Sequence, residues 1–286
     1  MSKHKTETHA VRAGDNLTLK AKVPELPEGA FTSESLAPMK TPEATALMRR
    51  VYNAQVRNTL AAGKTYLFGL PDDDLRLVED DHWMHKEASD DCRWLLLFAR
   101  QELQRIQAAK PSKHPITIGI ASAYRTPEDD GKAWHAAFTT HYDDTKPKRD
   151  EFDTGAHGDE AFRLLLKIMP KAKAAAGFSN HTQGRAVDFS TQEVIDGKLQ
   201  FLTAKTSQHE LWKKCWFFKW LVADGNAAKY RFVELSNPGT TEEWHYDHKM
   251  DMKLPGGKKI PESPQGEDGE VVASNSVAPP NANPKT

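Results

Sequence analysis

The sequence predicts a single α+β domain over residues 41–253, preceded by a polar arm (1–40) and followed by a tail (254–286). Stretches with apolar residues at helical spacing are mixed with short β-branched or apolar runs, which is typical of an α+β fold. From Leu254 onward the chain is rich in Pro, Gly, Ser and Asn and poor in large apolar residues. Such a composition cannot bury enough surface to offset the entropy of ordering, so we expect flexible ends around one folded domain.

Helix starts are indicated by cap residues. Thr41 is a good N-cap and Pro42 suits the first helical position, after which apolar residues repeat at helical spacing as far as Gly63. The same Thr-Pro-Glu pattern opens a second such helix at Thr126. The predicted helices cover residues 42–63, 87–109, 126–138, 160–169 and 211–223.

Strands are expected where short β-branched or apolar runs occur. Residues 116–120 alternate with period two, and Ala186–Phe189 is a buried-strand candidate. Further strands are predicted over residues 231–235 and around Trp244–Tyr246. Residues 143–159 are rich in charge, Gly and Lys, and we expect them to form an exposed insertion.

Composition excludes several classes of protein. Lys and Arg (39) balance Asp and Glu (40), so no general attraction to nucleic acid or anionic membrane is expected. The apolar stretches, such as Trp94–Ala99, are far shorter than the about 20 residues of a membrane span, and the N-terminus has no Sec-type apolar region. Cys92 and Cys215 lie among large apolar residues and are expected to be buried thiols. We therefore expect a soluble protein made in the cytoplasm.

The segment from Ser179 to Asp188 carries the most informative chemistry. His181 precedes Asp188 by seven residues, with a glycine between them for a tight turn, so that an imidazole and a carboxylate can reach one cation. His245, expected on another strand, adds a second imidazole. Two imidazoles and one carboxylate form a zinc set that leaves a fourth position open, as in catalytic zinc sites.

Two further groups suit hydrolysis at such a site. Glu242, three residues before His245, is a candidate general base for a water molecule. Arg125, at the end of the predicted strand 116–120, can supply a fixed positive charge for the oxyanion that forms after attack.

These motifs together resemble a known family. The patterns S-x-Y-R, S-x-H-x-x-G-x-A-x-D and E-x-W-H, in this order, are similar to those of zinc D-alanyl-D-alanine carboxypeptidases, the D,D-dipeptidases of vancomycin resistance and phage L-alanyl-D-glutamate endopeptidases. The resemblance extends from Ile116 to about Asp247. It implies the fold shared with lysostaphin-type peptidases and the hedgehog signalling domain, a small antiparallel sheet flanked by helices.

The resemblance also implies a role for each matching residue. One Zn²⁺ ion would be held by His181, Asp188 and His245, with Glu242 as catalytic base and Arg125 stabilising the transition state. Three more residues are expected to contact the substrate: Ser179, Ser122 and Tyr124. The chain departs from the family at Arg231, where glycine is usual, and at Glu243, where proline is common. The second departure puts another carboxylate beside the expected base.

The implied activity is hydrolysis of a bond in the peptidoglycan stem peptide, either D-Ala-D-Ala or L-Ala-D-Glu. The alternative is a non-catalytic, zinc-containing component that binds the cell wall or belongs to a phage tail or injection machine. Residues 9–17 resemble the opening of a LysM peptidoglycan-binding module, although a solvated arm is the simpler interpretation. Because no Sec signal is seen, we expect action in the periplasm or cell wall after phage release or delivery by a contractile injection machine.

Overall fold

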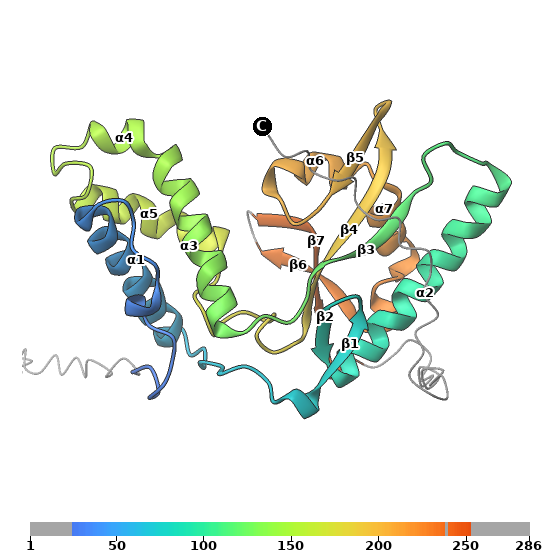
Figure 1. Cartoon of the computed structure of the whole chain (residues 1–286), viewed down its shortest axis with the longest axis horizontal. Coiled ribbons are helices and arrows are strands. Elements are labelled where there is room, and N and C mark those ends of the chain that lie inside the picture. The colour runs from blue at the N-terminus through green and yellow to red at the C-terminus, as the bar shows by residue number, and fades with distance from the viewer. Residues whose placement is uncertain (1–24, 238–239, 253–286) are drawn as a thin grey trace, which may run out of the picture.

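A computed structural model describes residues 25–237 and 240–252 (Figure 1). The expectations for residues 1–24 and for the tail from 254 onward lie outside this range. The helices are α1 (Pro42–Ala61), α2 (Lys86–Ala109), α3 (Pro127–Asp144), α4 (Lys146–Asp150), α5 (Asp159–Ala172), α6 (His209–Trp212) and α7 (Trp216–Val222). The strands are β1 (Leu75–Glu79), β2 (His82–His85), β3 (Thr117–Ser122), β4 (Ala186–Ile195), β5 (Lys198–Leu202), β6 (Phe232–Asn237) and β7 (Thr240–His248). The predicted mixture of helices with a small sheet is confirmed.

The main sheet is antiparallel throughout and is centred on β4. Strands β3, β4, β7 and β6 pair in that order, and β5 pairs with the outer half of β4. Strand β7 pairs with the first residues of β4, where Asp188 lies opposite His245. Strands β1 and β2 form a separate hairpin. Sheet pairing therefore joins the two parts of the sequence that carry the expected metal ligands.

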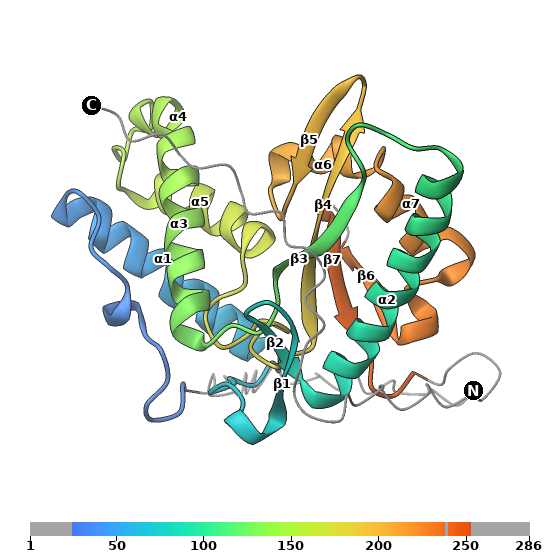
Figure 2. The same ribbon diagram turned by 45° about the vertical axis from the view of Figure 1, so that its right-hand side comes forward.

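The alternation of side chains along β4 and β7 separates an apolar face from a polar face. Val187 and Phe189 of β4, with Trp244 and Tyr246 of β7, belong to a buried cluster that includes residues of α2 and α7. Figure 2 shows α2 crossing one face of the sheet. Because successive side chains of a strand point to opposite faces, His245 and its cross-strand neighbour on β4 point away from this cluster.

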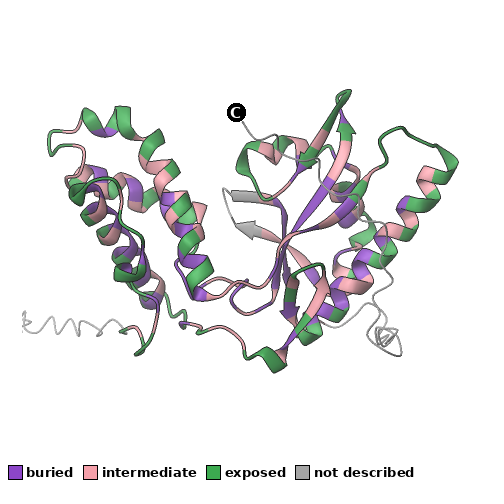
Figure 3. Ribbon diagram, in the orientation of Figure 1, coloured by how far each residue is buried: buried purple, intermediate pink, exposed green. Residues whose placement is uncertain are grey.

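A second hydrophobic cluster lies among α1, α3 and α5, which stand together on the other side of the molecule (Figures 1 and 3). Trp134 is its largest fully buried side chain, and its indole N–H donates to Gln55 Oε1 over 2.9 Å. Helices α1 and α3 begin as predicted, since Thr41 and Thr126 accept hydrogen bonds from Ala44 and Asp129. Those threonines fix where the two helices start.

Part of the segment assigned to the polar arm packs into this second cluster. Phe31 and Leu36 are buried there, and Phe31 N donates to the hydroxyl of Tyr66 over 2.8 Å. A Cβ atom at Gly131 would lie 2.3 Å from the ring of Phe31, so α3 accepts this ring only at a glycine. The packed part of the chain thus begins before residue 41.

The expectation that residues 143–159 form an exposed insertion is wrong in part, because the segment includes helical residues and a buried side chain. Helix α3 continues to Asp144, α4 follows, and Arg149 of α4 is almost fully buried. Its guanidinium donates to the carbonyl oxygens of Tyr142 and Ala156 over 2.7 and 2.6 Å and lies 3.8 Å from the centre of the Tyr142 ring. Because main-chain carbonyls satisfy the buried charge, a segment that is polar in sequence becomes partly internal.

The predicted helix over 211–223 is divided into α6 and α7, and Cys215 Sγ accepts from Phe218 N at the start of α7. Cys215 and Cys92 are fully buried free thiols, as expected. The hairpin β1–β2 and strand β5 were not predicted. Within the described residues, none of the helices has the length and apolar character that a membrane crossing requires.

Candidate active site

The expected metal ligands come together from three segments. His181 lies in the turn over residues 179–185, Asp188 on β4 and His245 on β7. Their ligand atoms lie within 4.8 Å of one another, and all three residues are buried. Among the residues that the structure describes, this is the one group of His, Cys, Asp and Glu with such an arrangement.

The turn that carries His181 depends on Gly184. This glycine has a φ of +62°, and its N–H donates to the carbonyl of His181 over 2.9 Å. An added Cβ would lie 2.5 Å from His85 N, which itself donates to the Gly184 carbonyl. The left-handed conformation and the close approach of β2 both favour glycine here, as the sequence suggested.

The two imidazoles face one carboxylate. His245 Nδ1 lies 2.8 Å from Asp188 Oδ1, and His181 Nε2 lies 3.4 Å from Asp188 Oδ2. The other nitrogen of each ring is bound elsewhere: His181 Nδ1 to the Ala123 carbonyl at 2.6 Å, and His245 Nε2 to Asp247 Oδ1 at 3.2 Å. Each imidazole therefore presents one nitrogen to a shared position beside Asp188.

This donor set fits zinc. Two imidazoles and one carboxylate are ligands of catalytic zinc, and ligand atoms around a tetrahedral ion with bonds of about 2.1 Å lie about 3.4 Å apart. The separation of 3.4 Å between His181 Nε2 and Asp188 Oδ2 matches this value, and the separation of 2.8 Å between His245 Nδ1 and Asp188 Oδ1 is shorter. In zinc sites the second histidine nitrogen commonly donates to a carbonyl or carboxylate, as both histidines do here.

The charges of the site reflect the same contacts. Burial lowers the pKa of His181. Burial by itself would raise the pKa of Asp188, but His181 and His245 outweigh it and hold this pKa well below its usual range. For His245, burial is outweighed by hydrogen bonds to Asp188 and Asp247, which raise its pKa to about 10. Asp188 is therefore an anion, ready to act as a ligand.

Arg125 lies three residues after the end of β3, and its guanidinium lies beside the expected ligand Asp188. Its Nη1 is 2.7 Å from Ser122 Oγ and 3.6 Å from Asp188 Oδ2, and its Nε donates to Asp130 Oδ1 over 2.8 Å. Asp130 also accepts from Thr182 Oγ1 over 2.6 Å. A buried carboxylate on α3 thus links the arginine to the turn that carries His181, one of the expected ligands.

The two neighbouring glutamates of β7 have different surroundings. Glu243 is buried, with Oε2 2.5 Å from His209 Nδ1 of α6 and Oε1 3.9 Å from Lys213. Glu242 is half-buried, and burial raises its pKa, while the charges of His245, Asp188 and Arg125 also act on it. Pairing of β6 with β7 is irregular between Glu234 and Ser236, so regular alternation does not fix the direction of Glu242.

The three residues expected to bind substrate use their hydroxyl groups within the protein. Ser179 Oγ accepts from His181 N over 3.2 Å, Ser122 Oγ accepts from Arg125, and the hydroxyl of Tyr124 accepts from Leu70 N over 3.1 Å. All three border the segments of the site, and their contact with substrate stays a prediction, as do the roles of the other site residues.

Asp130 and Asp247 are site residues that the sequence reasoning missed. Asp130 could have been noticed, since it occupies the buried face of α3 together with Pro127, Trp134 and Phe138. An acidic residue at such a position needs a partner. Asp247 follows His245 by two residues, which is same-face spacing on a strand, but its partner could not be read from that spacing.

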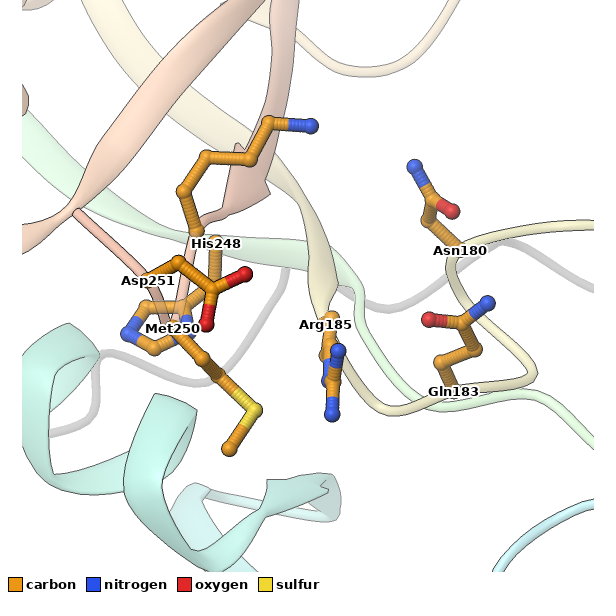
Figure 4. A pocket seen from close by; sticks show the side chains of 7 residues that line it. Asn180, Gln183, Arg185, His248, Met250 and Asp251 are labelled. Atoms are coloured by element: carbon orange, nitrogen blue, oxygen red, sulfur yellow. The ribbon is translucent and has the colours of Figure 1, made fainter.

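A cavity of about 190 Å³ lies beside the turn and the end of β7 (Figure 4). Figure 4 shows Asn180 and Gln183 on one side and His248, Met250 and Asp251 on the other, with Arg185 between them. Its lining residues are Asn180, Gln183, Arg185, His248, Lys249, Met250 and Asp251. None of the expected ligands lines this cavity, so it adjoins the metal group without containing it.

Three solved structures are similar to part of this chain. The structure described as VanYB in complex with D-alanine-D-alanine has a TM-score of 0.39 and 17% identity, covering 63% of this chain and 81% of that chain. The structure of a mutant of the vancomycin resistance D,D-pentapeptidase VanY in complex with Zn(II) has a TM-score of 0.38 and 17% identity, covering 63% of this chain and 82% of that chain. The structure of the LD-carboxypeptidase LdcB has a TM-score of 0.35 and 15% identity, covering 77% of this chain and 87% of that chain.

No curated protein matches the chain. The family model for VanY, D-alanyl-D-alanine carboxypeptidase, matches residues 95–250, which is more than half of the 286 residues. This segment includes Arg125, Glu242 and the three residues whose ligand atoms converge. The chain belongs to the VanY D-alanyl-D-alanine carboxypeptidase family.

Proposed function

We propose that the chain is a zinc-dependent carboxypeptidase that removes the terminal D-alanine from peptidoglycan stem peptides ending in D-Ala-D-Ala. The observation that carries the proposal is the buried group of His181, Asp188 and His245 within the segment that matches the family. When bound there, zinc supplies a Lewis acid that polarises a carbonyl group and makes water a nucleophile near neutral pH.

Glu242 is proposed as the general base. Its carboxylate takes a proton from the attacking water and later donates it to the leaving amine. Its half-buried setting near His245 supports this role, because burial raises its pKa and favours a group that can both accept and release a proton. Glu243 is less suited, since its carboxylate is bound to His209.

Arg125 is proposed to stabilise the oxyanion. Its Nη1 lies 3.6 Å from Asp188 Oδ2, so a fixed positive charge stands beside the ligand group. The contacts with Asp130 and Ser122 hold the guanidinium in place before substrate binds. A preorganised charge stabilises a developing oxyanion better than one that must first reorient.

The test is mass spectrometry of purified muropeptides after incubation with the zinc-loaded protein. Loss of a terminal D-Ala is expected, whereas release of peptides from L-Ala would instead indicate an endopeptidase. Glu242→Gln should keep its zinc but lose about 10²–10⁴-fold in rate, the usual contribution of general acid–base catalysis. Glu102→Gln, on α2, is the matched control and should retain full activity, since the Glu102 carboxylate pairs with the exposed Arg105 of the same helix.

Unchanged muropeptides, with zinc shown to be bound, would refute the proposal and favour the non-catalytic cell-wall-binding role. The site of action in the periplasm or cell wall stays a prediction, and so does delivery by a phage or contractile injection machine.

A further inference from the structure

The two histidines of the metal group differ in what holds the nitrogen that faces away from Asp188. His181 Nδ1 is bound to a main-chain carbonyl, that of Ala123, at 2.6 Å. His245 Nε2 is instead bound to a side-chain carboxylate, Asp247 Oδ1, at 3.2 Å. A carboxylate accepts more strongly than a neutral carbonyl, and it favours the tautomer that carries hydrogen on Nε2.

Asp247 is buried and its position is determined by several contacts. Its side chain is 6% exposed, its Oδ1 is bound to His245, and Lys249 Nζ lies 3.7 Å from Oδ2. Across the sheet it lies opposite Ala186, whose small side chain leaves room on this face. A buried carboxylate with these partners has a defined orientation, which it can impose on the imidazole it contacts.

Asn180 and Lys249 also line the 190 Å³ cavity shown in Figure 4. The sequence of contacts therefore runs from the cavity wall through Asp247 to His245, and from His245 Nδ1 to Asp188. Among the described residues, Asp247 supplies the carboxylate that contacts His245 Nε2.

We infer that Asp247 is a positioning residue for the metal site: it holds hydrogen on Nε2 of His245 and keeps the Nδ1 lone pair directed at the position shared with Asp188 and His181. This role rests on the proposed zinc site but is distinct from the peptidase activity. It assigns a function to an acidic residue outside the E-x-W-H motif.

The first test measures zinc affinity by competition with a chelating indicator. Asp247→Ala should bind zinc about 10–100-fold more weakly, the usual effect of removing an outer partner of a metal-binding histidine. The zinc affinity of Asp247→Asn should lie between those of the unmodified chain and Asp247→Ala, because its amide oxygen can still accept from Nε2–H but carries no charge. Asp251→Ala is the matched control: Asp251 lines the same cavity, is exposed, and should leave the affinity unchanged.

The second test observes the hydrogen on His245 Nε2 by ¹H–¹⁵N NMR of the zinc-loaded protein, in which coordination through Nδ1 leaves the hydrogen on Nε2. The unmodified chain should show a strongly downfield, hydrogen-bonded Nε2–H signal for His245, and in Asp247→Ala this signal should shift upfield. A general loss of folding would not produce this specific change, and Asp247→Asn provides the reading if the alanine variant fails to fold.

The outcomes separate the two proposals. If the unmodified chain binds zinc and Asp247→Ala binds it equally well with the same Nε2–H signal, the role of Asp247 is overturned while the zinc site stands. If the unmodified chain binds no zinc, both the proposed function and this inference are overturned.

Discussion

Removal of the Asp130 carboxylate should destabilise the fold far more than removal of its neighbour in sequence. Asp130 is 2% exposed and accepts from Arg125 Nε over 2.8 Å and from Thr182 Oγ1 over 2.6 Å. The adjacent Asp129 instead makes an exposed ion pair with Lys132. The two aspartates lie on one helix and differ mainly in burial, so they form a matched pair.

The magnitude follows from what each variant leaves behind. Breaking a buried charge pair from one side costs about 3–5 kcal/mol, because the remaining charge loses its partner. In Asp130→Ala, Arg125 would still contact Ser122 Oγ and lie 3.6 Å from Asp188, so we expect the lower end, about 3 kcal/mol. Asp129→Ala should cost about 1 kcal/mol or less, as is usual for an exposed pair.

The assay is urea unfolding followed by tryptophan fluorescence, with both variants and the unmodified chain kept free of metal. Asp130→Asn, which preserves the shape of the side chain but removes its charge, serves if the alanine variant does not fold. Equal free energies of unfolding for Asp130→Ala and Asp129→Ala would show that the buried pair does not stabilise the fold in the way described.

Three further predictions concern metal, thiols and the ligand turn. Chelation of zinc should lower the Tm, measured by calorimetry, by about 5–10 °C. Zinc at 100 times its Kd adds about 2.7 kcal/mol to the free energy of unfolding, and each kcal/mol shifts the Tm by about 2–4 °C. An unchanged Tm after verified zinc removal would contradict this prediction. Burial raises the pKa of Cys92 well above its usual value and that of Cys215 to about 12, so at pH 8 both stay protonated and should react with a disulfide reagent only after urea is added. Rapid reaction of either cysteine in the folded chain would contradict this prediction. Gly184→Ala should lower the free energy of unfolding more than Gly155→Ala. Both glycines have positive φ, but only at Gly184 would the added Cβ meet His85 N. Equal losses in the two variants would show that this close approach does not require glycine.

Local signals in the sequence predicted much of the secondary structure. Thr41 and Thr126, each followed by proline, mark helix starts that the structure confirms, because an N-cap acts within one turn of the chain. The buried run Ala186–Phe189 was correctly predicted as a core strand. The hairpin β1–β2 was missed because its two strands are very short, with five and four residues, and they gain their order from packing against α2.

The sequence by itself identified the three residues whose possible ligand atoms converge in the structure. His181, Gly184 and Asp188 are close in sequence, so a turn and one strand suffice to bring the first two ligand groups together. The motif around His245 supplied the third by resemblance to a family, not by any local physical signal.

Only the tertiary structure decided what the other carboxylates do. Glu243, Asp130 and Asp247 are equally acidic in the sequence, yet one meets His209, one meets Arg125 and one meets His245. These partners are set by the register of β7 against β4 and by the packing of α3 and α6, contacts between segments that are far apart or irregularly paired. The role of a buried acid depends on the partner that satisfies it, and that partner exists only once the chain is folded.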